Sequence, residues 1–351
     1  MATGKLTAEP FASRWKRRVR TIPMMLAITV AGVVASPLVV VSAAAVDIVK
    51  GRFRMPTVRV ALFLLQYAIN DSVEIILAPV YWMLAGLGTR LDQPASLRRH
   101  ERLQQWSIDV MARRAERLLG LRIDIDAESM QALCPGPVIV FCRHVNVVDA
   151  SLPTVLYQRL GYRTRCAIMA ELLADPGFDL IYGRTGSVFI PRDHGLEARV
   201  MLQRPSEGAD SRTAAVIFPE GRLFRPDRLE RTMSRLAEQS PERALSLASL
   251  RHVLPPRPGG ALALLDAMPG ADVVVIAHAG LDRFASFAEL AKAVPLADQI
   301  RVIAWRLPAS EIPNGDQERT RWLDEQWLGV DDWVAQSRDG VTPQSELTKP
   351  R

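Results

Sequence analysis

Residues whose types could carry chemistry occur first at the end of the apolar run Val138–Cys142, which leads into Arg143 and His144. Asp149 follows His144 five residues later. On one continuous helix this spacing would turn the two side chains ~140° apart, so they would not share a face. If His144 lies on a strand-to-helix turn and Asp149 in the next helical turn, the carboxylate can bind Nδ1 and leave Nε2 as a general base. A loop histidine beside a helix-capping aspartate explains the same pattern.

A second polar cluster follows the apolar run Val216–Phe218 and consists of a proline, Glu220, Gly221 and Arg222, with Arg225 close behind. Proline and glycine favour a tight turn, and open α/β sheets bind ligands where their strands end. An arginine at such a turn suits a phosphate group, because its guanidinium can donate two parallel hydrogen bonds. Taken alone, the cluster is better explained as an ordinary strand-ending turn with a surface arginine.

Together, the two clusters resemble the signatures of the glycerophospholipid acyltransferase family, N-H-x4-D and F-P-E-G-T-R. The second signature ends here at Arg222, and its Glu220 lies 76 residues beyond His144, a separation that fits the family. The family places a G-x-x-F-x-x-R block between the two signatures, and the segment from Gly186 to Arg192 matches it.

Two later segments extend the resemblance toward the C-terminus. The segment Leu250–Arg257 resembles the KHVLTPR segment of lysocardiolipin-type and related lysophosphatidic acid acyltransferases. Ile312-Pro313, followed by Trp322-Leu323, resembles the end of those proteins. The resemblance therefore covers about residues 138–334.

In this family, the histidine removes a proton from an acceptor hydroxyl, which attacks an acyl thioester. The resemblance implies that His144 is this base and that Asp149 holds its tautomer and stabilises the imidazolium. Acyl-CoA or acyl carrier protein would be the co-substrate, with no metal and no other cofactor.

The resemblance also assigns substrate-binding residues. It implies that Arg192 and Arg222 hold the acceptor phosphate, and that Gly221 shapes the turn beside them. Glu220 would orient this site by bonding to an arginine or a hydroxyl. The sequence lacks the threonine of the second signature, so the phosphate-binding arginine there is either Arg222 or Arg225. A further departure is Arg143, which stands where the family usually has asparagine.

The function expected from the resemblance is acyl transfer to the free hydroxyl of a lysophospholipid, most simply 1-acyl-glycerol-3-phosphate, giving phosphatidic acid. One alternative is a remodelling acyltransferase or transacylase that acts on another lysolipid, such as lysocardiolipin. A catalytically inactive membrane scaffold of the same fold and a thioesterase-type hydrolase are two more.

Other residues of chemical interest are given structural explanations. His278 and Asp282 follow an apolar run, but they lack an arginine partner in the sequence pattern and are expected to form a loop. Cys142 is expected to be a buried structural thiol and not a nucleophile.

The elements that must position these residues are short apolar runs alternating with helical stretches over residues 91–310. This alternation predicts an α/β fold with a sheet layered by helices. The resemblance implies that the sheet is mixed and that the fold is the glycerolipid acyltransferase fold. A helix is expected from 95 to 119, ended by Gly120. Residues 311–351 are expected to form a C-terminal helical appendage and tail. The predicted strands are Leu121–Ile125, Val138–Cys142, Ala167–Met169, Ser187–Ile190, Ala214–Phe218, Val273–Ala277 and Arg301–Trp305.

The N-terminal part of the chain is strongly apolar. The run Thr21–Val46 has 26 uncharged residues, or ~39 Å as a helix, against a bilayer core of ~30 Å. Basic residues flank the run on both sides, and the positive-inside rule places both flanks in the cytoplasm. We therefore expect a basic tail over 1–20 and a membrane-associated helical hairpin over 21–90, with Pro37 as the point where the chain turns back. The alternatives are an ordinary membrane span and, less favoured, a signal peptide.

Charge and composition narrow the class of partner. Residues 1–60 carry ten basic and two acidic groups, so the net charge of +6 belongs to the N-terminus and the remainder is slightly acidic. This distribution favours membrane lipids over nucleic acid as the partner. Three cysteines without C-x-x-C spacing indicate neither a disulfide framework nor a zinc module. We expect a membrane-associated protein with its active site on the cytoplasmic face.

Overall fold

The computed structural model describes residues 9–191, 201–284 and 286–338. The chain forms two compact units, each of which is described by itself. Unit 1 comprises residues 1–121, 165–204 and 290–297, and unit 2 comprises residues 122–164, 205–289 and 298–351.

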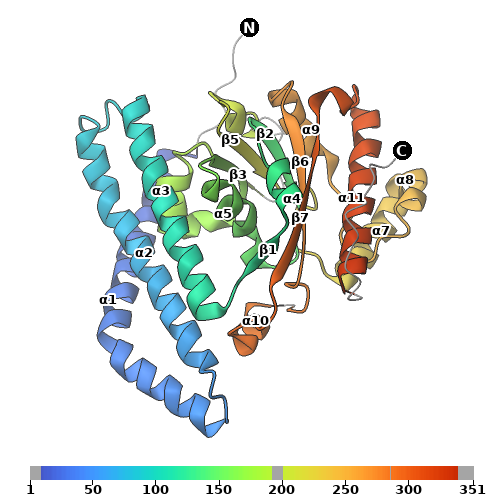
Figure 1. The fold of residues 1–351 in the computed structure, drawn as a ribbon. Helices are drawn as coiled ribbons and strands as arrows, with labels where there is room; N and C mark the ends of the chain where they lie inside the picture. Colours follow the sequence, from blue (N-terminus) through green and yellow to red (C-terminus); the bar gives the residue numbers. More distant parts are fainter. Residues whose placement is uncertain (1–8, 192–200, 285, 339–351) are drawn as a thin grey trace. The chain divides into compact units, whose positions relative to one another are not determined.

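Unit 1 is dominated by three long helices, α1 (Phe11–Val49), α2 (Pro56–Leu84) and α3 (Pro94–Arg114). Figure 1 shows α1 as one continuous helix that bends along its length, as expected for a helix with internal prolines. The prediction that the chain turns back at Pro37 is therefore wrong. A proline removes one backbone donor and bends the helix, but it does not end it here.

The turn between α1 and α2 lies instead at residues 50–55, and Asp47 fixes it. The Asp47 side chain is fully buried, and its Oδ2 accepts from the backbone N–H groups of Thr57 (2.9 Å) and Val58 (3.3 Å). Its Oδ1 accepts from the Thr57 hydroxyl at 2.7 Å. Asp47 thus satisfies the free N–H groups at the start of α2. In the middle of the pair, Thr29 of α1 donates to the Ala68 carbonyl of α2 at 3.0 Å.

Both helices of this pair are long and apolar enough to cross a membrane, judged by length and composition. They differ in how much of their apolar surface unit 1 covers. Of the most apolar stretch, 6% is buried in α1 and 33% in α2. Side chains such as Val34 and Leu38 of α1 are 76% and 72% exposed. So large a continuous apolar surface marks an interaction site for protein or lipid.

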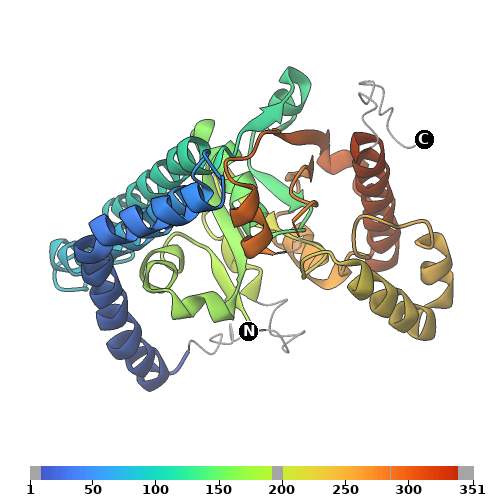
Figure 2. The same ribbon diagram turned by 90° about the horizontal axis from the view of Figure 1, so that it is seen from below.

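The remainder of unit 1 packs against α2 and α3, which run side by side (Figures 1 and 2). A π-helical turn over Ala115–Leu119 continues α3, and Gly120 ends it in the left-handed conformation at φ 72°, as the sequence predicts. Arg17 and Arg18 of α1 both bind the carboxylate of Asp179, so the basic N-terminal segment is partly helical and ion-paired. The other elements are β4 (Val188–Ile190), which pairs in parallel with β3 (Arg163–Met169), and two short helices, η3 (Ala170–Ala174) and η4 (Phe178–Tyr182).

Unit 2 is built on a sheet with strand order β1-β7-β6-β2-β5. Neighbouring strands are parallel except for β6 and β7, which are antiparallel, so the sheet is mixed, as predicted. Every residue of the central strand β2 is buried, because β2 lies between β5 and β6. The strands are β1 (Ile123–Ile125), β2 (Val138–Cys142), β5 (Thr213–Ile217), β6 (Asp272–Ala279) and β7 (Ile300–Leu307).

Helices cover this sheet and connect its strands (Figure 1), which confirms the predicted α/β fold. The last of them, α11 (Asp316–Arg338), packs on β6 and buries Trp322, Trp327 and Trp333. The expected C-terminal appendage is therefore an integral part of unit 2. The remaining helices are α4 (Ala127–Ala132), η2 (Val147–Ser151), α5 (Leu152–Arg159), α7 (Pro226–Gln239), α8 (Pro241–Ser246), α9 (Pro258–Ala267) and η6 (Ala309–Glu311); η5 (Arg204–Ser206) and α10 (Phe287–Ala293) lie at boundaries between the units.

Candidate active site

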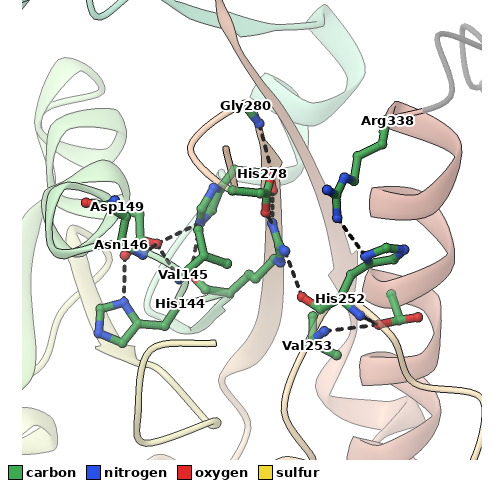
Figure 3. Close-up of polar contacts among 12 residues, drawn as sticks. His144, Val145, Asn146, Asp149, His252, Val253, His278, Gly280 and Arg338 are labelled. Atoms are coloured by element: carbon green, nitrogen blue, oxygen red, sulfur yellow. Dashed lines mark hydrogen bonds and ion pairs between the residues drawn. The ribbon is translucent and has the colours of Figure 1, made fainter. Parts of the chain in front are cut away.

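His144 and Asp149 meet at the carboxyl end of β2, in unit 2. His144 Nδ1 lies 2.6 Å from Asp149 Oδ1, so the carboxylate accepts the Nδ1 proton. Figure 3 shows Nε2 on the side of the ring that faces away from Asp149. The His144 side chain is 16% exposed, whereas that of Asp149 is fully buried. The ring of Phe218 covers part of His144, with the ring centroids 4.5 Å apart.

The local fold explains how residues five apart come together. β2 ends at Cys142, and the chain then turns into the short 3-10 helix η2, which Asn146 caps. Asp149 Oδ2 accepts from the backbone N–H groups of Val145 (2.6 Å) and Asn146 (2.8 Å). Asp149 is therefore a capping residue and the partner of His144 at once, so the two explanations of the sequence pattern are compatible.

The surroundings of the site keep Asp149 ionised and the thiol of Cys142 neutral. Burial alone would raise the pKa of Asp149, but hydrogen bonds from His144 and His278 outweigh burial and lower the pKa below its usual range. Cys142 lies two residues before His144 and is fully buried. Burial, then the charges of Asp149 and Glu220, raise the pKa of its thiol well above the usual value, so Cys142 is not a nucleophile.

Glu220 holds two segments of the site together through its carboxylate. Oε1 accepts from the backbone N–H of His144 and Oε2 from that of Leu254, both at 2.9 Å. In the described part of the chain, the hydrogen bonds of this carboxylate come from backbone N–H groups, and the expected bond to an arginine or a hydroxyl stays a prediction. Glu220 is 1% exposed, and burial raises its pKa to about 7 against the opposing effect of these N–H groups and Arg143.

Arg143, the departure from the family pattern, is a buried structural cation. Its Nη1 donates to the carbonyl of His278 and its Nη2 to the carbonyl of His252, both at 2.7 Å. The guanidinium also forms an ion pair with Asp282. A fully buried charge needs such compensation, and three oxygens provide it here.

The sequence suggested that His278 and Asp282 form a loop and lack an arginine partner. The structure differs on both points. His278 lies within β6 and is fully buried, and Asp282 is the partner of Arg143. The spacing along the chain concealed this arrangement, because Arg143 reaches the pair across the boundary between two neighbouring strands, β2 and β6.

The turn after β5 brings the second cluster next to His144. Gly221 has φ +64°, and its N–H donates to the Phe218 carbonyl at 2.9 Å, so it closes a tight turn and is not free to bind an oxyanion. Farther along the turn, the Phe224 N–H donates to the His144 carbonyl at 2.8 Å. The loop that carries Glu220, Gly221 and Arg222 is therefore fixed directly to the base.

The arginines of this loop differ in how they are held. Arg225 is 58% exposed and bonds to Asp227, with Nε 3.1 Å from Oδ1. Arg222 is exposed and has no ion pair with a residue that the structure describes. Arg257 comes from a different segment, at the start of α9, and packs against this turn. Its N–H donates to the Pro219 carbonyl at 2.8 Å, and a Cβ on Gly221 would come within 3.2 Å of Arg257 Cδ. Sequence reasoning singled out the segment containing Arg257 but gave this residue no role.

The segment 250–257 is anchored mainly by α11 and α8, which the sequence did not reveal. Asp331 Oδ1 accepts from the N–H groups of Arg251, His252 and Val253, at 2.5 to 3.1 Å. Arg243 donates to the Pro256 carbonyl at 2.7 Å and binds Asp324. No pattern in the sequence joins a C-terminal helix to this loop.

Two further sequence expectations concern binding residues. Arg192 lies outside the described residues, so its assignment stays a prediction. No cluster of histidine, cysteine, aspartate and glutamate side chains suited to a metal ion occurs in the described part of the chain.

Comparisons with known proteins extend these observations. Residues 124–279 match a family described as Acyltransferase, and this segment contains His144, Asp149, Glu220 and His278. No match was found among curated proteins. Among solved structures, the 1-acyl-sn-glycerophosphate (LPA) acyltransferase PlsC from Thermotoga maritima is similar to this chain. The TM-score is 0.47 with 16% identity, over 80% of this chain and 98% of that chain, which is too distant to bear on function.

Proposed function

We propose that this protein, whose residues 124–279 form a domain of the acyltransferase family, transfers an acyl chain from a thioester to the free hydroxyl of a lysophospholipid. The observation that supports the proposal is the His144–Asp149 pair. The buried carboxylate accepts a hydrogen bond from Nδ1, so Nε2 can bind the hydroxyl of the acceptor lipid. The donor is acyl-CoA or acyl carrier protein, and the acceptor is most simply 1-acyl-glycerol-3-phosphate.

In the proposed reaction, His144 Nε2 takes the proton of the acceptor hydroxyl while that oxygen attacks the thioester carbon. Collapse of the tetrahedral intermediate forms the ester and breaks the carbon–sulfur bond. The thiolate leaves and takes the proton back from the imidazolium. Asp149 stabilises that imidazolium and fixes the tautomer, since its carboxylate accepts from Nδ1 throughout.

The acceptor phosphate is proposed to bind Arg222, with Arg192 as a second ligand. Support for Arg222 over Arg225 comes from their partners, since Arg225 is bonded to Asp227 and Arg222 has no such ion pair among the described residues. Arg257, from the segment that packs against this turn, adds a second positive charge near Arg222. An unpaired guanidinium next to another is stabilised by an anion.

Membrane attachment is proposed to use α1 and α2, with the active site on the cytoplasmic face. The exposed apolar surface of α1 needs a cover. Because α1 runs unbroken between them, residues 14–20 and 50–59 both stay in the cytoplasm when the helical pair lies along one leaflet with its apolar side immersed. Cysteine labelling from either side of sealed vesicles tests this arrangement. Labelling of residue 52 from the non-cytoplasmic side would contradict it.

The function is tested with the purified full chain, acyl-CoA and a panel of lysophospholipids with different headgroups. We expect lysophosphatidic acid to be acylated fastest. Faster acylation of lysocardiolipin or another lysolipid would indicate a remodelling enzyme, and release of free fatty acid would indicate a thioesterase. The absence of any acyl transfer, with folded protein and either donor, would contradict the proposal and favour an inactive scaffold.

A further inference from the structure

His278 lies behind Asp149, on the side away from His144, and its ring is completely buried. His278 Nε2 is 3.4 Å from Asp149 Oδ2 and 3.0 Å from the Arg143 carbonyl oxygen. The Asp149 carboxylate accepts from His144 at Oδ1 and from two backbone N–H groups at Oδ2. The His278 Nε2–H group, which is hydrogen-bonded to the Arg143 carbonyl, also lies against Oδ2. Figure 3 shows the two imidazole rings on different sides of Asp149.

The contacts of His278 define its tautomer. Both neighbours of Nε2 are acceptors, so Nε2 carries the proton. The other ring nitrogen, Nδ1, has no hydrogen-bond partner among the residues that the structure describes. The polar contacts of this buried ring therefore all lie on the side of Asp149 and the Arg143 main chain.

The main chain of His278 is fixed as firmly as its ring. The Arg143 guanidinium donates to the His278 carbonyl while the His278 ring donates to the Arg143 carbonyl, so the two residues bind each other reciprocally. Asp282 balances the charge of Arg143. Asp149, Arg143 and Asp282 are thus charged groups close to His278.

We propose that His278 is a positioning residue that orients the Asp149 carboxylate toward His144. The proposal rests on the proposed function, since it concerns the same base. Two backbone N–H groups hold Oδ2, and the partly positive Nε2–H group of His278 lies against the same oxygen, so the carboxylate presents Oδ1 to the His144 imidazole in one orientation. Each lost donor allows the carboxylate to turn and weakens its support of the His144 tautomer.

Two isosteric amides test this role. In His278→Gln, the amide N–H can reach the position of Nε2 and keep an N–H group against Asp149 Oδ2. In His278→Asn, the shorter amide reaches only the position of Nδ1, so the donor is lost while size and polarity are nearly kept. We expect kcat to fall about tenfold in His278→Asn, to return to within about threefold of wild type in His278→Gln, and KM for both substrates to stay within about twofold. His252→Leu, a histidine whose ring bonds to Arg338 and not to Asp149, is the matched control and should change neither constant.

Equal losses in the Gln and Asn variants, or no loss in either, would overturn the proposal. A second result would also overturn it. If His278→Asn lowers kcat by the same factor in the Asp149→Asn background as in wild type, His278 does not act through Asp149.

A second measurement does not depend on activity. Proton NMR with ¹⁵N-labelled histidine follows the His144 Nδ1 proton. We expect a low-field resonance in wild type and His278→Gln that broadens or moves in His278→Asn, and an unchanged resonance would contradict the proposal. A wild-type chain that shows this resonance but transfers no acyl group would reject the proposed function alone. Should either variant fail to fold by circular dichroism, the same resonance is measured in His278→Thr, which also lacks a donor at Nε2, and an unchanged signal there overturns the role.

Discussion

The two sides of the candidate site are built in different ways. On the base side, comprising His144, Asp149, Glu220 and His278, buried carboxylates bind backbone and ring donors at 2.6 to 3.4 Å. The arginine side comprises Arg222, Arg225 and Arg257. These exposed arginines come from the turn after β5 and from the start of α9, two segments whose main chains are fixed by hydrogen bonds.

This difference matches two separate tasks. A general base needs one orientation and one tautomer, and buried hydrogen bonds supply both before the substrate arrives. A phosphate on a lipid headgroup needs charge at a surface that a membrane-bound substrate can reach, and exposed arginines supply that. The base side should therefore control kcat, and the arginine side should control the KM of the acceptor.

The largest effect on kcat alone is expected from Asp149→Asn, on the base side. The amide cannot stabilise the imidazolium, and its N–H group can favour the wrong tautomer of His144, so kcat should fall by ~10²–10⁴-fold. The KM of the lysolipid should change little. Steady-state kinetics at saturating acyl-CoA measure both constants, and a change confined to KM would contradict the assignment of Asp149 to the base side.

A smaller effect is expected from Arg222→Ala, on the other side of the site. Loss of a charge-assisted hydrogen bond costs ~1.5–3 kcal/mol, which corresponds to a rise of roughly 10- to 100-fold in the KM of the lysolipid. The KM of acyl-CoA should stay nearly constant. Arg225→Ala is the matched control, because Asp227 already binds its guanidinium. A larger effect of Arg225→Ala would reverse the choice between the two arginines.

Arg192→Ala tests the second proposed phosphate ligand in the same assay. It should raise the KM of the lysolipid more than the KM of acyl-CoA, for the reason given for Arg222. Equal effects on both substrates would exclude Arg192 from the acceptor site.

The last and smallest expected effect is one on stability, from Glu220→Gln. The amide would turn an N–H group toward the backbone N–H of either His144 or Leu254, which should cost ~1–3 kcal/mol of folding free energy. Burial raises the pKa of Glu220 from 4.5 to about 7, so the folded state binds this proton more tightly than the unfolded chain does. The contribution of Glu220 to the free energy of unfolding should therefore decrease as the pH rises from about 4.5 to about 7. In Glu220→Gln this decrease should be absent. Thermal unfolding at several pH values measures the difference, and parallel curves would contradict it.

The sequence predicted much of the fold and the base side because both depend on local patterns. Apolar runs such as Val138–Cys142 are strands, and His144 and Asp149 lie on one turn after a strand. The sequence could not show contacts between distant segments. The bond of Arg143 to Asp282, and that of Asp331 to segment 250–257, join residues 78 or more positions apart, and no periodicity encodes them.

The N-terminal helices show a second limit of local patterns. Pro37 was a reasonable position for a turn, but the helix continues through it to Val49. The turn formed where Asp47 could cap the next helix, a choice set by one buried side chain and its partners in residues 57 and 58.

The central claim is that His144 is a general base supported by Asp149, and a double-mutant cycle on acyl transfer tests it most directly. The measurement compares kcat of wild type, His144→Ala, Asp149→Asn and the double variant, with circular dichroism to confirm folding. We expect His144→Ala alone to lower kcat by ~10²–10⁴-fold, and the double variant to be no slower than His144→Ala, because the two residues act as one unit. Activity of His144→Ala within a few-fold of wild type, or fully additive losses in the double variant, would contradict the claim.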